Sequence, residues 1–196
     1  MSRVGKEQIK IPAGVTVEFN DGIVTATGSL GTLKQEIKSP ITVSIEGGEV
    51  KVSRGDRNDN QAKALHGLYN RLIQNMVQGV SKGFVRTLIL NGVGYKVAMK
   101  GDRLTLNIGK SHPEEIKGEQ GIKFKILTPQ EIQELNLGKD GIAQVIQVIG
   151  ASKEQVGAVA SNIRAKRVVE PYHLYGIRYS DERVIRKESK SGAKKK

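Results

Sequence analysis

The sequence predicts an α+β fold of two tandem duplicated domains, each an antiparallel β-sheet packed with one main α-helix. Two observations support this prediction. Short runs of alternating apolar and polar residues precede a single amphipathic stretch, and the same order then occurs a second time. The predicted boundaries are 1–82 for the first α+β domain, 83–179 for the second, and 180–196 for a basic carboxyl-terminal tail.

The first domain begins with two predicted hairpins. VTVEF (15–19) and IVTATG (23–28) are joined by Asn-Asp-Gly, and ITVSIE (41–46) and EVKVS (49–53) are joined by Gly-Gly. Alternation with a period of two is typical of half-buried strands, and these linking residues favour tight turns.

A helix is predicted after the hairpins. Asn58, Asp59 and Asn60 can cap its start, and apolar residues recur at helical spacing as far as Gly79. The apolar positions are Ala62, Leu65, Leu68, Tyr69, Leu72, Ile73 and Met76.

The second domain repeats this order. Its predicted strands are VRTLIL (85–90), YKVAMK (95–100), LTLNIG (104–109), IKFKIL (122–127) and AQVIQVIG (143–150). Because Gly101-Asp102 lies between the second and third, those two form a predicted hairpin.

A second helix is predicted to start at the capping-box pair Ser152 and Gln155. Its apolar stripe comprises Val156, Val159, Ala160 and Ile163. A constant offset of 94 residues places Gln61 over Gln155 and superimposes the two helices, which indicates an internal duplication. Residues 128–140 have no counterpart in the first domain and form either a surface loop or a short extra helix.

Positive charge is concentrated at the carboxyl end. Residues 163–196 hold 11 Lys+Arg and 4 Asp+Glu, a net of +7, and residues 1–162 hold 21 and 16, a net of +5. Clustered cations displace counterions from a phosphate backbone, so this placement favours a polyanionic partner over a purely solubilising role. A membrane surface is not expected, because the basic tail has no amphipathic apolar face.

Few residues suit catalysis or metal binding. The chain has no cysteine, its three histidines are far apart, and Ser111-His112 has no evident acidic partner. NGVGY (91–95) lacks the third glycine of a dinucleotide fingerprint, so it is interpreted as a structural bend or a secondary RNA contact. We therefore expect no enzyme activity, no cofactor, no metal and no small-molecule substrate.

A cytoplasmic location is expected as well. The first residues lack an apolar run of signal-peptide length, and no window approaches the roughly 18 apolar residues of a membrane span.

The stretch RVVEPYHLYGIRYSDERVIRK (167–187) combines aromatic and cationic residues. Pro171 is expected to end regular structure there, and the tyrosines and arginines alternate after it. Flat side chains stack on unpaired bases and arginines bind phosphate oxygens, so the stretch predicts RNA contact. In the alternative interpretation, the tyrosines pack the second domain and the charges are simply solvated.

Several blocks together resemble the bacterial form of large-subunit ribosomal protein L6. They are the opening MSRVGK…IPAGV, ALHGLYNRLIQNMVQGVSKGF (64–84), LNGVGYKVAMKGDRLTLNIGKSHP (90–113) and IRAKRVVEPYHLYGIRYSDERVIRK (163–187). They occur in the family's order and span nearly the whole chain.

The resemblance implies binding to 23S ribosomal RNA, mainly through the second domain and carboxyl end, near the base of the factor-recruiting stalk and the sarcin-ricin loop. It also implies neighbouring large-subunit ribosomal proteins at the stalk base as partners, with translation factors nearby. A competing hypothesis is an RNA-processing or other nucleic-acid-binding accessory protein.

One departure from the family lies after Glu170-Pro171-Tyr172, where His173, Leu174 and Tyr175 replace the usual Lys-Gly-Lys. The residues expected to bind RNA are Lys96, Lys110, Ser111, His112, Arg164, Lys166, Arg167, Tyr172, His173, Tyr175, Arg178, Tyr179, Arg183, Arg186 and Lys187.

Overall fold

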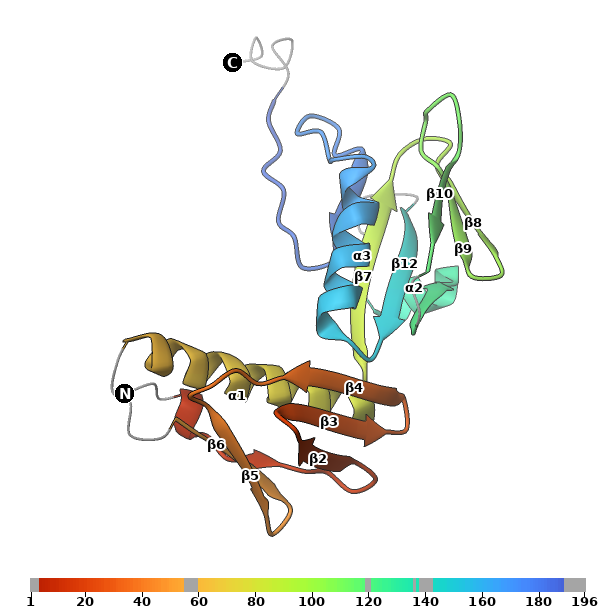
Figure 1. The fold of residues 1–196 in the computed structure, drawn as a ribbon. Coiled ribbons are helices and arrows are strands. Elements are labelled where there is room, and N and C mark those ends of the chain that lie inside the picture. Colours follow the sequence, from red (N-terminus) through yellow and green to blue (C-terminus); the bar gives the residue numbers. More distant parts are fainter. Residues whose placement is uncertain (1–3, 55–59, 119–120, 136, 138–142, 189–196) are drawn as a thin grey trace. The chain divides into compact units, whose positions relative to one another are not determined.

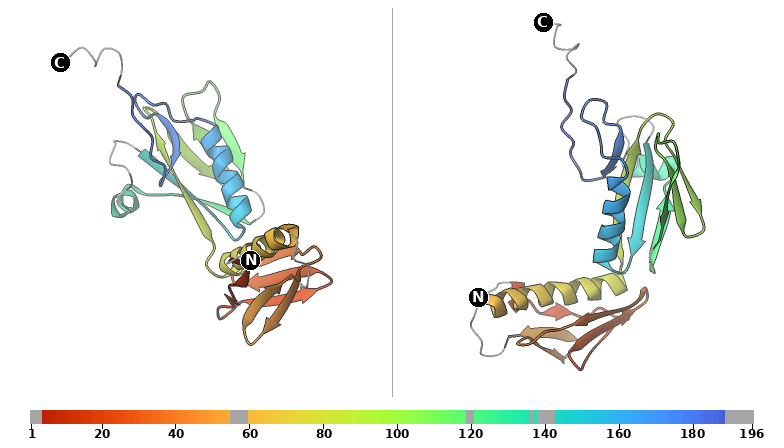
Figure 2. Two further views of the ribbon diagram at one scale, coloured as in Figure 1. Left: turned by 90° about the vertical axis from the view of Figure 1, so that its left-hand side faces the viewer. Right: turned by 45° about the horizontal axis from the view of Figure 1, so that its top comes forward.

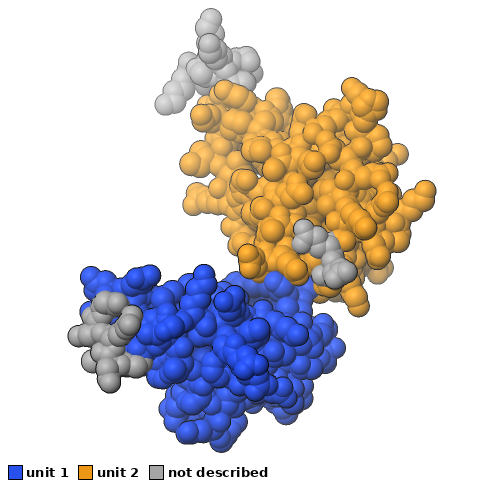
Figure 3. Space-filling model, in the orientation of Figure 1, with its two compact units in different colours: residues 1–84, 150–153 blue, residues 85–149, 154–196 orange. Residues whose placement is uncertain are grey.

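A computed structural model describes residues 4–54, 60–118, 121–135, 137 and 143–188 of the chain (Figure 1). The chain divides into two compact units, residues 1–84 with 150–153 and residues 85–149 with 154–196 (Figure 3). The predicted fold class is confirmed: the protein is α+β, with the same arrangement present twice. Each unit, however, contains two sheets, where one was expected.

The first unit has two three-stranded sheets, in the orders β1-β6-β5 and β2-β3-β4. All four of their strand pairings are antiparallel. After the 3₁₀ turn η1 (Val4–Lys6), the strands are β1 (Ile9–Lys10), β2 (Thr16–Asn20), β3 (Ile23–Gly28), β4 (Gly31–Glu36), β5 (Thr42–Glu46) and β6 (Glu49–Ser53).

Helix α1 (Asn60–Ser81) covers these sheets with its apolar face (Figure 2). Its Ile73 and Val80 are fully buried in one cluster with Val24 and Val50 of the strands. His66 of this helix is buried and has a structural role, since its Nε2 lies 2.9 Å from the carbonyl oxygen of Val52.

The second unit also has two sheets, in the orders β10-β9-β8 and β11-β12-β7-β13. Its helices are α2 (Pro129–Glu134) and α3 (Lys153–Ala165). Its strands are β7 (Phe84–Asn91), β8 (Lys96–Lys100), β9 (Arg103–Asn107), β10 (Glu114–Lys117), β11 (Ile122–Ile126), β12 (Ala143–Gly150) and β13 (Gly176–Tyr179).

The four-stranded sheet is buried on both faces. Consecutive residues of β7, Leu88 to Leu90, are buried, which requires cover on each side. Helix α3 lies along one side, and α2 lies on the other (Figure 2). Ile132 of α2 packs against the cluster of Ile89, Leu127 and Val145.

Of the two interpretations of 128–140, the short helix is correct for the part of this interval that the structure describes. Thr128 and Glu131 form a capping box, and Pro129 occupies the first turn. Lys125 donates to Glu131 at 2.5 Å, the main reason that the pKa of this carboxyl is lowered to about 2.

The duplication is visible in the connectivity. Each unit runs through six strands and then a long helix, β1 to β6 before α1 and β7 to β12 before α3, with α2 inserted. The sheet order β1-β6-β5 corresponds strand for strand to β7-β12-β11, and β2-β3-β4 corresponds to β8-β9-β10. Strand β13 is an addition to the second unit, on the outer edge of β7.

Strands β1, β4, β10 and β13 were absent from the sequence prediction, and Pro171 does not end regular structure. Strand β4 (GTLKQE) is mostly polar and lies at a sheet edge, so it shows little apolar alternation. Strand β13 (GIRY) has only four residues, including a glycine and an arginine. Such short or polar strands form because an exposed edge offers them hydrogen bonds.

Two sets of contacts attach the chain after α3 to the second unit. Strand β13 pairs antiparallel with β7, and Ile177 opposite Leu90 is fully buried. Arg164 of α3 donates from Nε to Glu182 Oε2 at 2.9 Å and from a terminal nitrogen to Oε1 at 2.5 Å. The Glu182 carboxylate also accepts from the backbone of Tyr179 at 3.2 Å.

We expect Ile177→Ala to destabilise the protein by about 2–5 kcal/mol, because it removes a fully buried side chain from the β7–β13 edge. Val93→Ala is the control: its side chain is 84% exposed, so its effect should be within about 0.5 kcal/mol. Urea denaturation measures both. Equal stabilities of the two variants would contradict the placement of β13 in the core.

Glu182→Gln should lower the free energy of unfolding at pH 7 by about 1–3 kcal/mol, because a charge-assisted pair is lost. The hydrogen bond from Arg164 lowers the pKa of Glu182 below its ordinary value near 4.5. Its stabilisation is therefore present above pH 4.5 and disappears as pH falls through the lowered pKa. Urea midpoints at pH 7 and pH 3 should show a difference from wild type that shrinks in acid, whereas Glu134→Gln, at an exposed site, should show none.

Candidate nucleic-acid interface

The loop between α3 and β13 presents three flat side chains to solvent. Tyr172 is 45% exposed and Tyr175 is 38% exposed. The ring of His173 stacks on that of Tyr175, with centroids 5.6 Å apart and an interplanar angle of 18°. Glu170 Oε1 accepts from the backbone of His173 at 2.6 Å, which holds the turn. These rings form a surface on which a base can stack.

The shape of this loop depends on Gly176. Its φ is +141°, and a Cβ there would lie 2.6 Å from Cα of Val169. Any larger residue would push the two arms of the loop apart.

The residues after β13 return to the same loop. The Lys187 amide donates to the Pro171 carbonyl at 2.9 Å, and Arg186 Nε donates to the Tyr172 carbonyl at 3.2 Å. Arg183, Arg186 and Lys187 are all exposed. The structure thus brings Arg186 and Lys187 close to the loop that bears the exposed aromatic rings, although up to 15 residues separate them in the chain. We call residues 170–187 the carboxyl segment.

Three predicted RNA-binding residues are engaged inside the protein. Arg164 pairs with Glu182, and the Tyr179 ring lies 4.9 Å from the Arg86 guanidinium and 5.7 Å from that of Arg164. Arg178 is half-buried on β13, where its charge helps to lower the pKa of Glu182. Contacts of these three side chains with the rest of the second unit stabilise the carboxyl segment.

Lys110 and Lys166 share one carboxylate. Glu114 Oε1 lies 2.7 Å from Lys110 Nζ, and its Oε2 lies 3.0 Å from Lys166 Nζ. These two hydrogen bonds lower the pKa of Glu114, so the acid stays ionised and offsets part of their charge. Glu114 lies on β10, which turns its carboxylate toward both lysines. Arg167 is exposed just beyond α3, and Ser111 and His112 are exposed between β9 and β10.

A cationic face on sheet β8-β9-β10 was largely missed by the sequence analysis. Cross-strand pairing puts one set of residues on one face and the buried Leu104 and Leu106 on the other. The exposed set includes Lys96, Lys100, Arg103, Lys117 and Glu115. Lys100 and Lys117 flank Arg103 on its two neighbouring strands, an arrangement that is unfavourable without an anion. Glu115, 3.3 Å from Arg103, compensates only in part. Strand alternation in YKVAMKGDR could have indicated this face.

NGVGY (91–95) forms a bend rather than a phosphate loop. Gly94 has a φ of +76°, and the Tyr95 amide donates to the Gly92 carbonyl at 3.3 Å. Among the described residues, no group of three or more His, Cys, Asp or Glu is placed to hold a metal ion. None of the helices described by the structure is long and apolar enough to cross a membrane.

Comparison with known proteins agrees with this architecture. A family model described as Ribosomal protein L6 matches residues 11–83 and 91–180, one match in each unit. The chain is 44% identical over 192 residues to the "Large ribosomal subunit protein uL6" of Shouchella clausii (strain KSM-K16), covering 98% of this chain and 99% of that protein. It is 46% identical over 193 residues to the protein of the same name from Clostridium perfringens (strain SM101 / Type A), with the same coverage.

The resemblance noted from the sequence is therefore confirmed. Two matches that coincide with the duplicated units, and this identity over nearly the full length, show that the chain belongs to the ribosomal protein L6 family, in its bacterial large-subunit form.

Proposed function

We propose that the protein is a structural component of the large ribosomal subunit that binds 23S ribosomal RNA through its second unit. The observation that carries this proposal is the meeting of exposed rings and exposed cations in the carboxyl segment. Hydrogen bonds join Lys187 to Pro171 and Arg186 to Tyr172, so these two exposed cations lie beside the loop that bears the three rings. The exposed Arg183 precedes them by three residues in the chain. Rings that can stack and cations that can bind phosphate suit folded RNA with unpaired bases.

The cationic face of sheet β8-β9-β10 extends the proposed interface. It has no aromatic side chain among Lys96, Ala98, Lys100, Arg103, Thr105 and Asn107, so it suits phosphate and sugar contact rather than base stacking. Lys110, Ser111, His112, Lys166 and Arg167 remain proposed contacts, and Arg164, Arg178 and Tyr179 are proposed to position the segment.

The family resemblance supports a finer proposal about location. Near the stalk base and the sarcin-ricin loop, the protein would adjoin neighbouring ribosomal proteins and the site where translation factors dock, in the cytoplasm. The fold suits such a role, since paired strands on packed helices make a firm support for the loops.

Replacing Arg183, Arg186 and Lys187 together by Ala should weaken binding to purified 23S RNA and flatten its salt dependence. Each lost phosphate contact reduces the slope of log K against log salt concentration by about 0.7–0.9. Filter binding between 50 and 300 mM KCl measures the slope. Arg178 is left unchanged because it is half-buried on β13. A loss of binding on its replacement would not separate an effect on folding from an effect on RNA contact.

The matched control replaces Lys10, Lys34 and Lys51 of the first unit, which are also exposed, and this replacement removes the same charge. Equal losses in both triple variants would mean that net charge alone attracts the RNA, against the proposed interface.

Replacing Tyr172 and Tyr175 by Leu should weaken RNA binding at every salt concentration while leaving the slope unchanged. Base stacking contributes about 1–3 kcal/mol per base and releases no counterions. Tyr172→Phe with Tyr175→Phe keeps the rings and should bind nearly as wild type. If the leucine variant binds normally, the rings pack the protein without contacting RNA.

A further inference from the structure

The outer edge of β1 in the first unit has no strand beside it among the described residues. In the order β1-β6-β5, β1 is terminal, whereas its counterpart in the second unit, β7, is flanked by β12 and by β13. The duplication therefore supplies an internal comparison. The strand edge that β13 covers on β7 in the second unit is uncovered on β1 in the first, among the described residues.

The backbone of β1 is oriented to accept such a strand. Ile11 donates to the Gly48 carbonyl at 2.9 Å, and the register pairs Ile9 with Val50 and Lys10 with Glu49. In an antiparallel ladder the hydrogen-bonded residues alternate, so Ile9 and Ile11 direct their polar groups toward β6. Gln8 and Lys10 direct theirs outward. A row of outward-facing backbone N–H and C=O groups is a template with which another strand can pair.

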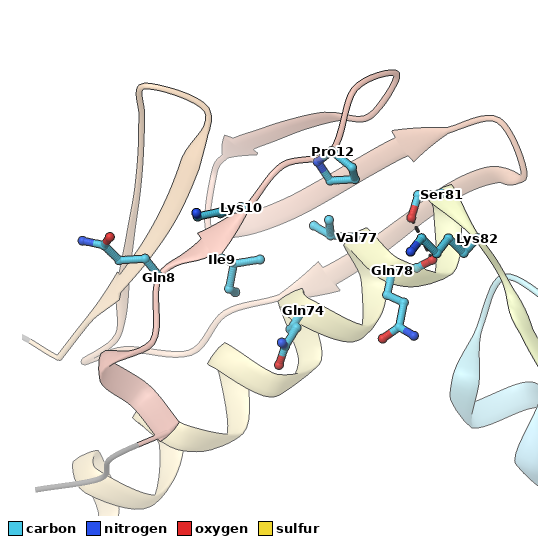
Figure 4. A pocket seen from close by; sticks show the side chains of 9 residues that line it. All are labelled: Gln8, Ile9, Lys10, Pro12, Gln74, Val77, Gln78, Ser81 and Lys82. Atoms are coloured by element: carbon cyan, nitrogen blue, oxygen red, sulfur yellow. Dashed lines mark hydrogen bonds between the residues drawn. The ribbon is translucent and has the colours of Figure 1, made fainter.

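A groove of about 420 Å³ lies along this edge, between β1 and the second half of α1 (Figure 4). Its floor is apolar, since Ile9 and Val77 are both buried. Gln74, Gln78 and Ser81 line it from α1 at positions i, i+4 and i+7, one face of the helix. Lys10 and Lys82 also line it.

These features suit a peptide better than RNA. Glutamine amides can hydrogen-bond to a peptide backbone, and the apolar floor can receive one of its side chains. The two lysines that line the groove favour acidic residues in the bound stretch. RNA would leave the apolar floor uncovered.

We propose that an extended segment of a neighbouring large-subunit protein pairs with the free edge of β1 and lies in this groove, as β13 lies on β7. The segment would carry an apolar residue over Ile9 and Val77, flanked by acidic residues. This inference rests on the proposed function, because the partner must belong to the same particle.

Amide exchange tests the pairing directly. In purified large subunits that contain this chain, the Lys10 amide should exchange at least tenfold more slowly than in the free protein, because its outward N–H is then hydrogen-bonded to the partner. Mass spectrometry of peptides spanning residues 8–12 measures this. Equal exchange in both states would overturn the inference.

A second test uses Lys10→Pro, which removes the outward N–H but none that β6 uses. Its control, Lys10→Ala, removes the same charge and keeps the N–H. Because the chain has no cysteine, Gln78→Cys provides a single attachment point in the groove for a photo-crosslinker. In purified subunits we expect a crosslink to one protein with Lys10→Ala, and at least a tenfold lower yield with Lys10→Pro.

Other outcomes have distinct meanings. A crosslink to RNA, or equal protein yields in the two variants, would contradict strand pairing at β1. Absence of the unmodified chain from sedimenting large subunits would instead refute the proposed function. If Lys10→Pro alone fails to fold, as shown by its urea midpoint, the exchange measurement on the unmodified protein still decides.

Discussion

The antiparallel pairing of β13 with β7 is the interaction on which the candidate interface depends. It buries Ile177 opposite Leu90 and continues in the donation from the Ser180 amide to the Thr87 carbonyl at 3.1 Å. Together with the Arg164–Glu182 ion pair, it fixes the path of the chain after α3. The loop and the residues that follow join opposite ends of β13, and the hydrogen bonds from Lys187 and Arg186 to Pro171 and Tyr172 bring these cations back to the loop of the rings.

The cationic side chains of the second unit fall into two groups, those paired with carboxylates and those exposed to solvent. Arg164, Lys110 and Lys166 face carboxylates of Glu182 and Glu114, and their contacts are internal. Arg183 and Lys187 are solvent-exposed. A net charge of +12 therefore overstates the cations available to a polyanion. In the carboxyl segment, the proposed interface uses Arg186 and Lys187, whose hydrogen bonds run to the backbone carbonyls of Tyr172 and Pro171 rather than to acids.

The two units share one arrangement of strands and helix but present different surfaces. Both have a three-strand core, β5-β6-β1 or β11-β12-β7, followed by a helix. In the second unit an added strand, β13 of the carboxyl segment, covers the outer edge of β7. In the first, that edge borders a groove. Duplication followed by extension of one copy thus gives two surfaces of different chemistry, one cationic and aromatic, the other a strand edge that no strand of the described residues covers.

The sequence by itself determined the α+β class, the duplication and the two long helices, because these depend on local periodicity and capping that neighbouring residues express. It also contained the Thr128-Glu131 capping box of α2. Only the tertiary structure decided that GIRY is a strand, that the Tyr179 ring contacts two arginines, and that Glu114 pairs with the distant Lys166. Edge strands and long-range ion pairs depend on partners tens of residues away, so no local pattern of residues specifies them.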